Sequence, residues 1–324
     1  MSTYPRLLGD IGGTNARFAW QAAAGGALDK VTAYPCADFP SLLDAMRHYI
    51  DAHPNLAPRP RWCAIGIANP VIGDHVQMTN HRWSFSTAEM QRALGLDRLL
   101  VINDFTALAL ALPFLPPSGL HQIAGRAGQA APGPLGLIGP GTGLGVSGLL
   151  PAREGRKALP IAGEGGHVTL APTSPLEDAV VAKLRRRYGH VSAERALSGP
   201  GLQNLYVALC DIDGVPARTL SPAEIAAHAR AGTNPQCLQA LDLFFGFLGN
   251  VAGNLALSLG ARGGIYVGGG IVPRLLDLIV RSRFAGQFVD KGRFRGYLEA
   301  IPIFVVEASA SPALLGAARA LEDL

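Results

Sequence analysis

Charged residues and cysteines are both scarce in this chain, and each scarcity excludes classes of protein. Charged side chains make up only 16% of the 324 residues, against 48% hydrophobic residues, which excludes an intrinsically disordered chain. The four cysteines are widely spaced and form no C-x-x-C pair. That spacing indicates neither a metal site nor a thioredoxin-type redox motif, so we expect single buried thiols in a reducing cytoplasm.

The sequence carries no pattern typical of a nucleic acid-binding or membrane protein. The net charge is +4, but the basic residues are scattered, and the one run, 185–187, ends a predicted helix. No zinc finger, helix-turn-helix or aromatic-basic stripe is present, so we expect no nucleic acid partner. The N-terminus has no apolar run of signal-peptide length. The apolar segment 244–261 places Asn250, Asn254 and Ser258 on one helical face, so we expect a buried helix, no membrane association and a cytoplasmic protein.

Two familiar phosphate-binding motifs are also missing. The chain has four lysines, and none lies in a G-x4-G-K-[ST] loop, which excludes a Walker A site. The first glycine-rich stretch, "LLGDIGGTNARFAW" at 7–20, leads into a second strand rather than a helix, so it is no dinucleotide fingerprint. An oxidoreductase is therefore a poor candidate. What remains is a glycine turn between strands, whose backbone N–H groups can face an anion.

Strands and helices alternate along the chain, which predicts an α/β protein with a partly parallel sheet. At this length we expect two domains, or one domain with a large insertion. A stretch rich in Pro and Gly, "PFLPPSG" at 113–119 and then "GRAGQAAPGP" at 125–134, is typical of a linker between them. The last helix takes Ser311 as N-cap and can pack back on the first domain. The expected strands are 6–11, 16–22, 30–36, 61–69, 75–79, 98–103 and 301–306. The segment 135–150 is expected to form a strand, a glycine turn and a strand, and the segment 263–272 a strand that leads into a glycine turn and a helix. The expected helices are 40–53, 86–95, 104–112, 175–188, 222–231 and 235–260.

A short repeat links the two halves. "GGTNARFA" at 12–19 aligns with "PGTGLGVS" at 140–147, with Gly13 over Gly141 and Thr14 over Thr142. Either stretch alone is consistent with a tight hairpin. Two matched turns, together with the later "VGGGI", favour a nucleotide held between two lobes. Asp10 would repel bare phosphate, but it suits a Mg²⁺ ion bound between carboxylate and phosphate.

Polar residues that can act on an alcohol lie elsewhere. Asp104 follows a buried strand and precedes a helix, so it either caps that helix or accepts a proton from an alcohol that attacks phosphorus. Glu164 and His167, in the turn "GEGGH", match no common zinc spacing and fit a clamp for a hydroxylated ligand. Glu194 alone is typical of a surface or first-turn residue.

Six motifs together closely resemble the bacterial glucokinases of the proteobacterial type. They are "GDIGGTNARFA", "MTNHRWSFS", "INDFTALALALP", "GPGTGLGV", "GEGGHVTLAP" and "SAERALSGPGLQNLY", and "VGGGIVPR" extends the match to residue 274. The resemblance implies a duplicated ribonuclease H-like α/β fold of the actin/hexokinase type, with two domains around a central cleft. It implies a small domain at 1–114, completed by 305–324, and a larger one at 115–304.

The same resemblance implies an activity and assigns residues to it. The activity is phosphorylation of the glucose 6-hydroxyl by ATP with Mg²⁺, in a homodimer, with Asp104 as the general base and Asp10 near the metal. The sugar hydroxyls would meet Asn103, Asp104, Glu164, His167 and Glu194. The nucleotide would be held by Gly9, Asp10, Ile11, Gly12, Gly13, Thr14, Gly141, Thr142 and Gly143 at its phosphates, and by Gly268, Gly269 and Gly270 near adenosine.

One departure separates the chain from the related repressor/kinase (ROK) sugar kinases. Those proteins follow a Glu-x-Gly-His motif with a zinc-binding cysteine cluster, whereas no cysteine occurs here between Cys63 and Cys210. We therefore expect no structural zinc. The first strand begins near residue 6, so we also expect no DNA-binding helix-turn-helix before it.

Two alternatives remain at this point. A kinase for another hexose, such as fructose or mannose, would carry a similar clamp of hydroxyl-binding side chains. A non-catalytic sugar or nucleotide sensor can share the fold, since fold does not fix function. Asp104 and the two glycine turns argue against the sensor.

Overall fold

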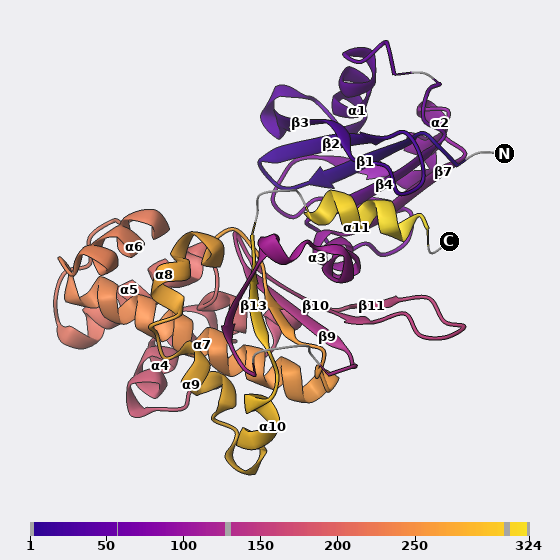
Figure 1. Ribbon diagram of the computed structural model, residues 1–324. Helices are drawn as coiled ribbons and strands as arrows, with labels where there is room; N and C mark the ends of the chain where they lie inside the picture. Colours follow the sequence, from indigo (N-terminus) through magenta and orange to yellow (C-terminus); the bar gives the residue numbers. More distant parts are fainter. Residues whose placement is uncertain (1–2, 57, 127–130, 308–311, 323–324) are drawn as a thin grey trace. The chain divides into compact units, whose positions relative to one another are not determined.

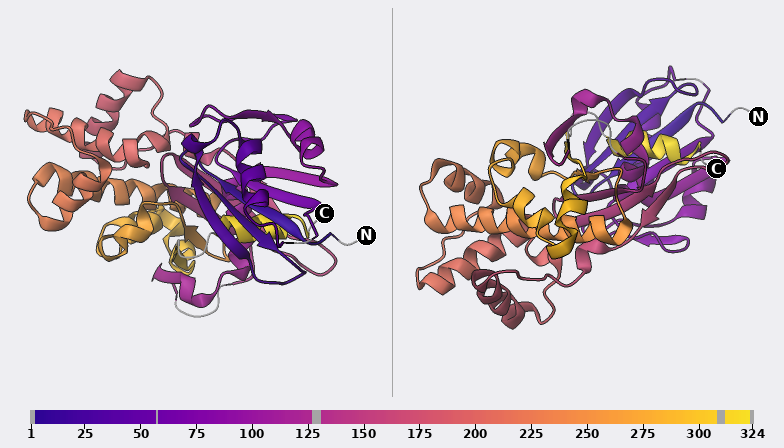
Figure 2. Two further views of the ribbon diagram at one scale, coloured as in Figure 1. Left: turned by 90° about the horizontal axis from the view of Figure 1, so that it is seen from above. Right: turned by 60° about the horizontal axis from the view of Figure 1, so that its bottom comes forward.

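The computed structural model describes residues 3–56, 58–126, 131–307 and 312–322 of the chain. The chain divides into two units (Figures 1 and 2). Unit 1 comprises Met1–Leu115, Pro151–Ala162 and Ala310–Leu324, and unit 2 comprises Pro116–Leu150 and Gly163–Ser309.

The sheet of unit 1 has the strand order β3-β2-β1-β4-β7. Its strands are β1 (Arg6–Ile11), β2 (Asn15–Gln21), β3 (Asp29–Pro35), β4 (Trp62–Ile67) and β7 (Arg98–Asn103). β1, β4 and β7 are parallel, while β2 is antiparallel to both β1 and β3. Ile11 pairs with Ile67, which pairs with Asn103. The first glycine turn and the Asn103-Asp104 pair therefore follow strands that end at one edge of the sheet, where ligands bind in α/β sheets.

Helices cover both faces of this sheet because successive side chains of a strand point to opposite faces. Leu7 and Ile11 pack in the core with α1 and α2, whereas Leu8 packs in the core with α11. Figures 1 and 2 show α11, from the C-terminal end of the chain, against the N-terminal sheet. The predicted N-cap Ser311 lies outside the described residues. The remaining elements are α1 (Leu42–Asp51), β5 (His75–Gln77), β6 (Ser84–Ser86), α2 (Thr87–Ala93), α3 (Asp104–Ala111), β11 (Leu159–Ala162) and α11 (Pro312–Ala320).

Unit 2 repeats this strand topology. β9 (Leu135–Pro140), β12 (Ile265–Val267) and β13 (Ile303–Val306) are parallel, and β10 (Leu144–Leu150) is antiparallel to β9. The order β10-β9-β12-β13 has the same strand directions as β2-β1-β4-β7. β8 (Leu120–Ala124) adds an antiparallel strand beside β13. The predicted duplicated α/β fold is confirmed by this agreement.

In unit 2, α5, α6, α9 and α10 contact the long helix α7 (Pro235–Leu259). Among the described residues, α7 is the one helix long and apolar enough to cross a membrane. In its most apolar window 78% of the residues are buried inside the protein, so the predicted buried helix is confirmed. Asn250 is buried and its side-chain amide donates to the Ala171 carbonyl at 3.0 Å, while Asn254 and Ser258 are exposed. The helices are α4 (Pro175–Tyr188), α5 (Gly199–Asp213), α6 (Pro222–Ala231), α7 (Pro235–Leu259), α8 (Leu276–Ile279), α9 (Phe284–Val289) and α10 (Arg295–Glu299).

Three expectations from the sequence are wrong. The stretch predicted as a linker contains β8, which pairs with β13. Helix α5 was not expected from its Ser-Gly-Pro-Gly start, yet Ser198 caps it by accepting from the Gly201 N–H at 2.9 Å. The boundary after residue 304 lies inside β13, which its ladders to β12 and β8 hold in unit 2, so the boundary falls after Ser309.

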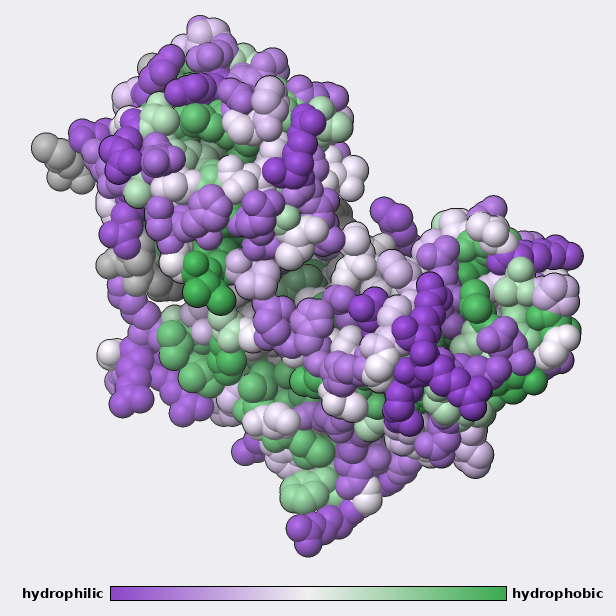
Figure 3. Space-filling model, turned by 180° about the vertical axis from the view of Figure 1, so that it is seen from behind, coloured by the Kyte–Doolittle hydropathy of each residue, from purple (hydrophilic) through white to green (hydrophobic). Residues whose placement is uncertain are grey.

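Exposed hydrophobic side chains are spread over both units. Among the described residues they include Val31 and Ile72 in unit 1 and Val168 and Phe294 in unit 2. On the face drawn in Figure 3, hydrophobic patches are bordered by hydrophilic residues. Such a mixed surface is usual for folded proteins.

Candidate active site

The first glycine turn begins one residue after β1 ends. The Gly12 N–H donates to the Asn15 carbonyl at 2.9 Å and closes the turn. A Cβ atom on Gly13 would lie 3.0 Å from the Asn80 Cβ, so glycine lets the turn pack against that neighbouring loop. Gly9 and Ile11 are buried strand residues, whereas Thr14 is exposed. In the segment 9–14, which was predicted to bind phosphate, the exposed surface therefore belongs to Asp10 and to the turn 12–14.

Asp10 is paired across the sheet. Its cross-strand neighbour on β2 is Arg17, whose Nη1 lies 3.3 Å from the Asp10 Oδ2. No group of three or more His, Cys, Asp or Glu side chains that could hold a metal ion occurs within the described ranges. One carboxylate without a protein cage fits Mg²⁺, which is usually held by one or two carboxylates together with substrate phosphates. Arg17 and such an ion would compete for the Asp10 carboxylate.

Asn103, and not Asp104, caps helix α3. The Asn103 Oδ1 accepts hydrogen bonds from the N–H groups of Phe105 at 2.9 Å and Thr106 at 3.1 Å. Asp104 is the first residue inside the helix, and its Oδ1 also accepts from the Phe105 N–H at 2.9 Å. The interpretation of Asp104 as the helix cap is therefore wrong. Its partly exposed carboxylate lies at the N-terminus of the helix, where the dipole favours negative charge.

Sequence reasoning missed Asn69, which supports this corner of unit 1. Asn69 follows β4, is 7% exposed, and accepts from the Asn103 Nδ2 through its carbonyl at 3.4 Å. Its own Oδ1 accepts from the Thr79 N–H at 2.9 Å. Asn69 thereby helps to orient the Asn103 amide so that its oxygen faces the helix. The signal was present, since Asn69 lies two residues after a parallel strand and Asn103 ends the neighbouring one.

The glycine turns of unit 2 lie beside each other. In the turn between β9 and β10, the Gly141 N–H donates to the Gly143 carbonyl at 2.8 Å. Gly269, after β12, has φ +79°, and a Cβ there would lie 2.3 Å from the Pro140 carbonyl oxygen. Only glycine fits such a backbone position. A Cβ on Gly141 would lie 3.9 Å from the Gly270 nitrogen, and the Ile271 N–H donates to the Pro140 carbonyl at 3.3 Å, so the turns 141–143 and 268–270 lie side by side.

The three predicted sugar-binding residues of unit 2 converge on the same edge. Glu164 and His167 are exposed, and the His167 N–H donates to the Glu164 carbonyl at 3.0 Å. The segment carrying Glu194 pairs with the residues after His167, because the Ala193 N–H donates to the Val168 carbonyl at 2.8 Å. Glu194 is partly buried, not a surface residue, and its Oε2 accepts from the Leu144 N–H at 2.9 Å.

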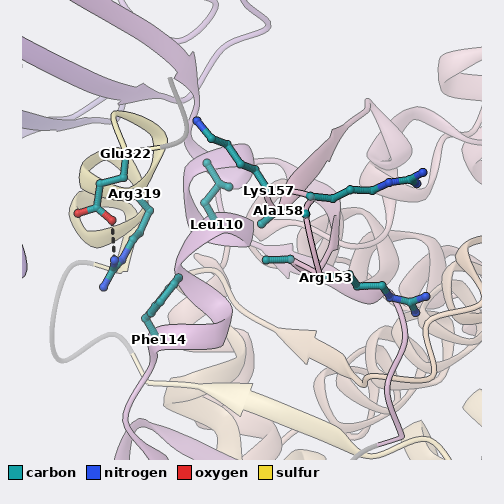
Figure 4. A pocket seen from close by; sticks show the side chains of 10 residues that line it. Leu110, Phe114, Arg153, Lys157, Ala158, Arg319 and Glu322 are labelled. Carbon is teal, nitrogen blue, oxygen red and sulfur yellow. Dashed lines mark hydrogen bonds and ion pairs between the residues drawn. The ribbon is translucent and has the colours of Figure 1, made fainter.

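A separate pocket of about 390 Å³ lies in unit 1 and contains none of the predicted site residues (Figure 4). The Arg319 guanidinium carbon lies 3.7 Å from the centre of the Phe114 ring, and the Arg319 Nη1 lies 2.5 Å from the Glu322 Oε2. Arg153 and Lys157 extend from the opposite wall in different directions. Because the basic groups do not converge, the pocket is no preformed anion site.

Two units share one strand topology, and each has a glycine turn between its paired antiparallel strands, so the protein has a duplicated α/β fold. The family model described as Glucokinase matches residues 7–324. The chain belongs to the glucokinase family.

Individual relatives agree along nearly the whole chain. The glucokinase of Aromatoleum aromaticum is 53% identical over 321 residues, covering 99% of this chain and 96% of its own. The crystal structure of a glucokinase from an Antarctic psychrotroph has a TM-score of 0.87 and 37% identity, covering 99% of both chains. A glucokinase from Balamuthia mandrillaris in complex with glucose has a TM-score of 0.75 at 22% identity, covering 96% of this chain and 92% of that one, which shows the fold alone.

Proposed function

We propose that this chain catalyses the ATP-dependent phosphorylation of D-glucose at the 6-hydroxyl, giving glucose 6-phosphate and ADP. Family membership over residues 7–324 carries the proposal. Asp104 and the first glycine turn follow strands that end at the same edge of the sheet, which supports the proposal.

Asp104 is the proposed general base. Its carboxylate takes the proton of the glucose 6-hydroxyl as that oxygen bonds to the γ-phosphorus of ATP, and the bond from phosphorus to the bridging oxygen breaks to release ADP. This reaction asks the protein chiefly for positioning and charge stabilisation. The Phe105 N–H orients the carboxylate, and the start of α3 favours its charge.

The remaining residues would bind and orient the two substrates. Asn103, Glu164, His167 and Glu194 supply amide, carboxylate and imidazole groups that can pair with sugar hydroxyls. Backbone N–H groups of the turns 12–14 and 141–143 would hold the phosphates, with 268–270 near adenosine. Mg²⁺, when bound, neutralises phosphate charge, and Asp10 is the residue that would hold it.

We also propose a cytoplasmic homodimer that works at the first step of glycolysis. Relatives named glucokinase support the metabolic role. Sedimentation velocity on the purified protein tests the assembly. A sedimentation coefficient that corresponds to the 33.8 kDa monomer at all concentrations would contradict the homodimer.

A panel of sugars crossed with phosphoryl donors tests the activity. Purified protein is supplied with Mg²⁺ and with glucose, fructose, mannose or glucosamine, and with ATP, ADP or polyphosphate. We expect product to form fastest with glucose and ATP, with glucose 6-phosphate identified by a dehydrogenase-coupled assay. A preference for fructose or mannose would assign the chain to another hexose, and the absence of sugar-dependent ATP consumption would favour a sensor.

A further inference from the structure

Leu144 joins the proposed phosphate turn to the proposed sugar clamp. It directly follows the turn 141–143, and its N–H donates to the Glu194 Oε2 at 2.9 Å. Its carbonyl oxygen faces the other part of the clamp, because a Cβ on Gly166 would lie only 2.1 Å from that oxygen. Both sugar-binding segments of unit 2 therefore contact one backbone residue of the phosphate turn.

Gly143 is what allows the Glu194 carboxylate to reach this position. A Cβ on Gly143 would lie 2.5 Å from the Glu194 Oε2 and 3.3 Å from its Cδ. Gly141, in the same turn, differs, since the nearest atom to its Cβ would be the Gly270 nitrogen at 3.9 Å. Neither glycine has a positive φ. An alanine fits at residue 141, whereas at residue 143 it must displace the carboxylate.

The backbone around Glu194 is held independently of its side chain. The Ser198 hydroxyl donates to the Glu194 carbonyl at 2.9 Å, and the Gly199 N–H donates to the Gly141 carbonyl at 2.8 Å. The Ser198 hydroxyl also caps α5, because its oxygen accepts a hydrogen bond from the Gly201 N–H. The start of α5 and the turn 141–143 are thus attached at a second point, so the side chain of Glu194 is the part that can respond to a ligand.

We propose that Glu194 has a second, positioning role: its carboxylate couples glucose binding to the geometry of the turn 141–143, which holds the ATP phosphates. A carboxylate offers about four acceptor sites, so one oxygen can hold the Leu144 N–H while the other accepts a sugar hydroxyl. Hydrogen bonds to an ionised acceptor are roughly twice as strong as neutral ones. Coupling between two ligands is reciprocal, so glucose tightens ATP binding and ATP tightens glucose binding by the same factor. This inference rests on the proposed function.

Two alanine variants of the same turn test whether the turn positions the Glu194 carboxylate for glucose. Glucose affinity is measured without nucleotide, by isothermal titration calorimetry, for the wild type, Gly143→Ala and Gly141→Ala. We expect Gly143→Ala to weaken glucose binding by about tenfold, or ~1.4 kcal/mol. Gly141→Ala should leave the glucose dissociation constant within about twofold, a change of less than ~0.5 kcal/mol. Equal glucose affinities in the two variants would overturn the proposal.

A second experiment measures the coupling between glucose and ATP directly. It also tests the proposal if Gly143→Ala does not fold. The affinity for a non-hydrolysable ATP analogue is measured with and without saturating glucose, in the wild type and in Glu194→Asp, whose shorter side chain withdraws the carboxylate from Leu144. Glucose should tighten analogue binding in the wild type and have little effect in the variant. An effect of the same size in both contradicts the coupling. A wild type that phosphorylates glucose without any such effect contradicts this inference alone, and one that binds no glucose contradicts the proposed function as well.

Discussion

Asn103 and Asp104 are adjacent, yet the fold gives them different tasks. The Asn103 oxygen satisfies two N–H groups at the start of α3, groups that otherwise have no partner inside the helix. The Asp104 carboxylate lies one residue further, inside the first turn, where it shares the Phe105 N–H. Asn103 is therefore the capping residue, and the Asp104 carboxylate, in the first turn, is the group proposed to accept the proton.

Because Asn103 caps α3 and is also proposed to bind glucose, its substitution should affect both stability and glucose binding. We expect Asn103→Ala to lower the free energy of unfolding by about 1 kcal/mol, the usual cost of losing an N-cap, and Asn103→Ser to restore most of it. Both variants lose the amide proposed to bind glucose, so both should raise the glucose dissociation constant. Urea denaturation and glucose titration on each variant measure the two effects. Unchanged stability in Asn103→Ala would contradict the capping role.

The burial of the cysteines predicts how slowly their thiols react in the native protein. All four are buried, and burial raises the pKa of the Cys36, Cys63 and Cys237 thiols. Because the thiolate is the reactive form, native protein at mildly alkaline pH should react slowly with iodoacetamide and react fully in urea. Mass spectrometry of the labelled protein measures this. Rapid native labelling of Cys63 would contradict its burial.

At the scale of elements, α11 completes unit 1 by packing closely on α3. A Cβ on Gly316 would lie 1.6 Å from the Ala107 carbonyl oxygen, so the helices can approach this closely only at a glycine. On the sheet side, Leu314 and Ala317 of α11 pack with Leu8 of β1. The C-terminal helix is therefore part of the core of unit 1.

This contact predicts the effect of adding one methyl group. Gly316→Ala should destabilise unit 1 by about 1–3 kcal/mol or more, as overpacking of a tight interior does. Gly286→Ala, in α9, is the matched control, because nothing lies within 4 Å of its Cβ, and alanine should there be neutral or stabilising. Thermal unfolding of both variants tests the difference. Equal midpoints would contradict the close approach of α3 and α11.

The sequence was informative where periodicity and capping agree and uninformative where contacts are long-range. The strand 98–103 and the helix 175–188 were predicted with the bounds that the structure has. β8 was missed because its pairing with β13 is not visible in the local Pro- and Gly-rich composition. The bond between Glu194 and the Leu144 N–H joins residues 50 positions apart, so no local pattern indicates it.

At the scale of the whole molecule, the two units are not consecutive pieces of chain. Unit 1 is assembled from three segments, and the chain passes between the units after residues 115, 150, 162 and 309. Unit 1 therefore depends on chain synthesised last, because α11 covers one face of its sheet.

Truncation tests this dependence. Removal of residues 310–324 takes away α11 and exposes Leu8, Ala19 and Ala64. We expect backbone amides of β1 and β4 to lose protection from hydrogen exchange, while those of α7, in unit 2, keep theirs. Hydrogen exchange followed by mass spectrometry reports both regions in one experiment. Unchanged protection in β1 would contradict the role of α11 in unit 1.

Asp104 is proposed to act as the base that activates the glucose 6-hydroxyl toward ATP. Asp104→Asn retains the shape and the hydrogen-bonding oxygen of the side chain but not its ability to accept the proton. The most direct test measures glucose-dependent ADP formation and glucose affinity in this variant and in the wild type. We predict that turnover falls by about 10²–10⁴-fold, the usual contribution of general base catalysis, while glucose binding is largely retained. Near-normal turnover in Asp104→Asn would contradict the account.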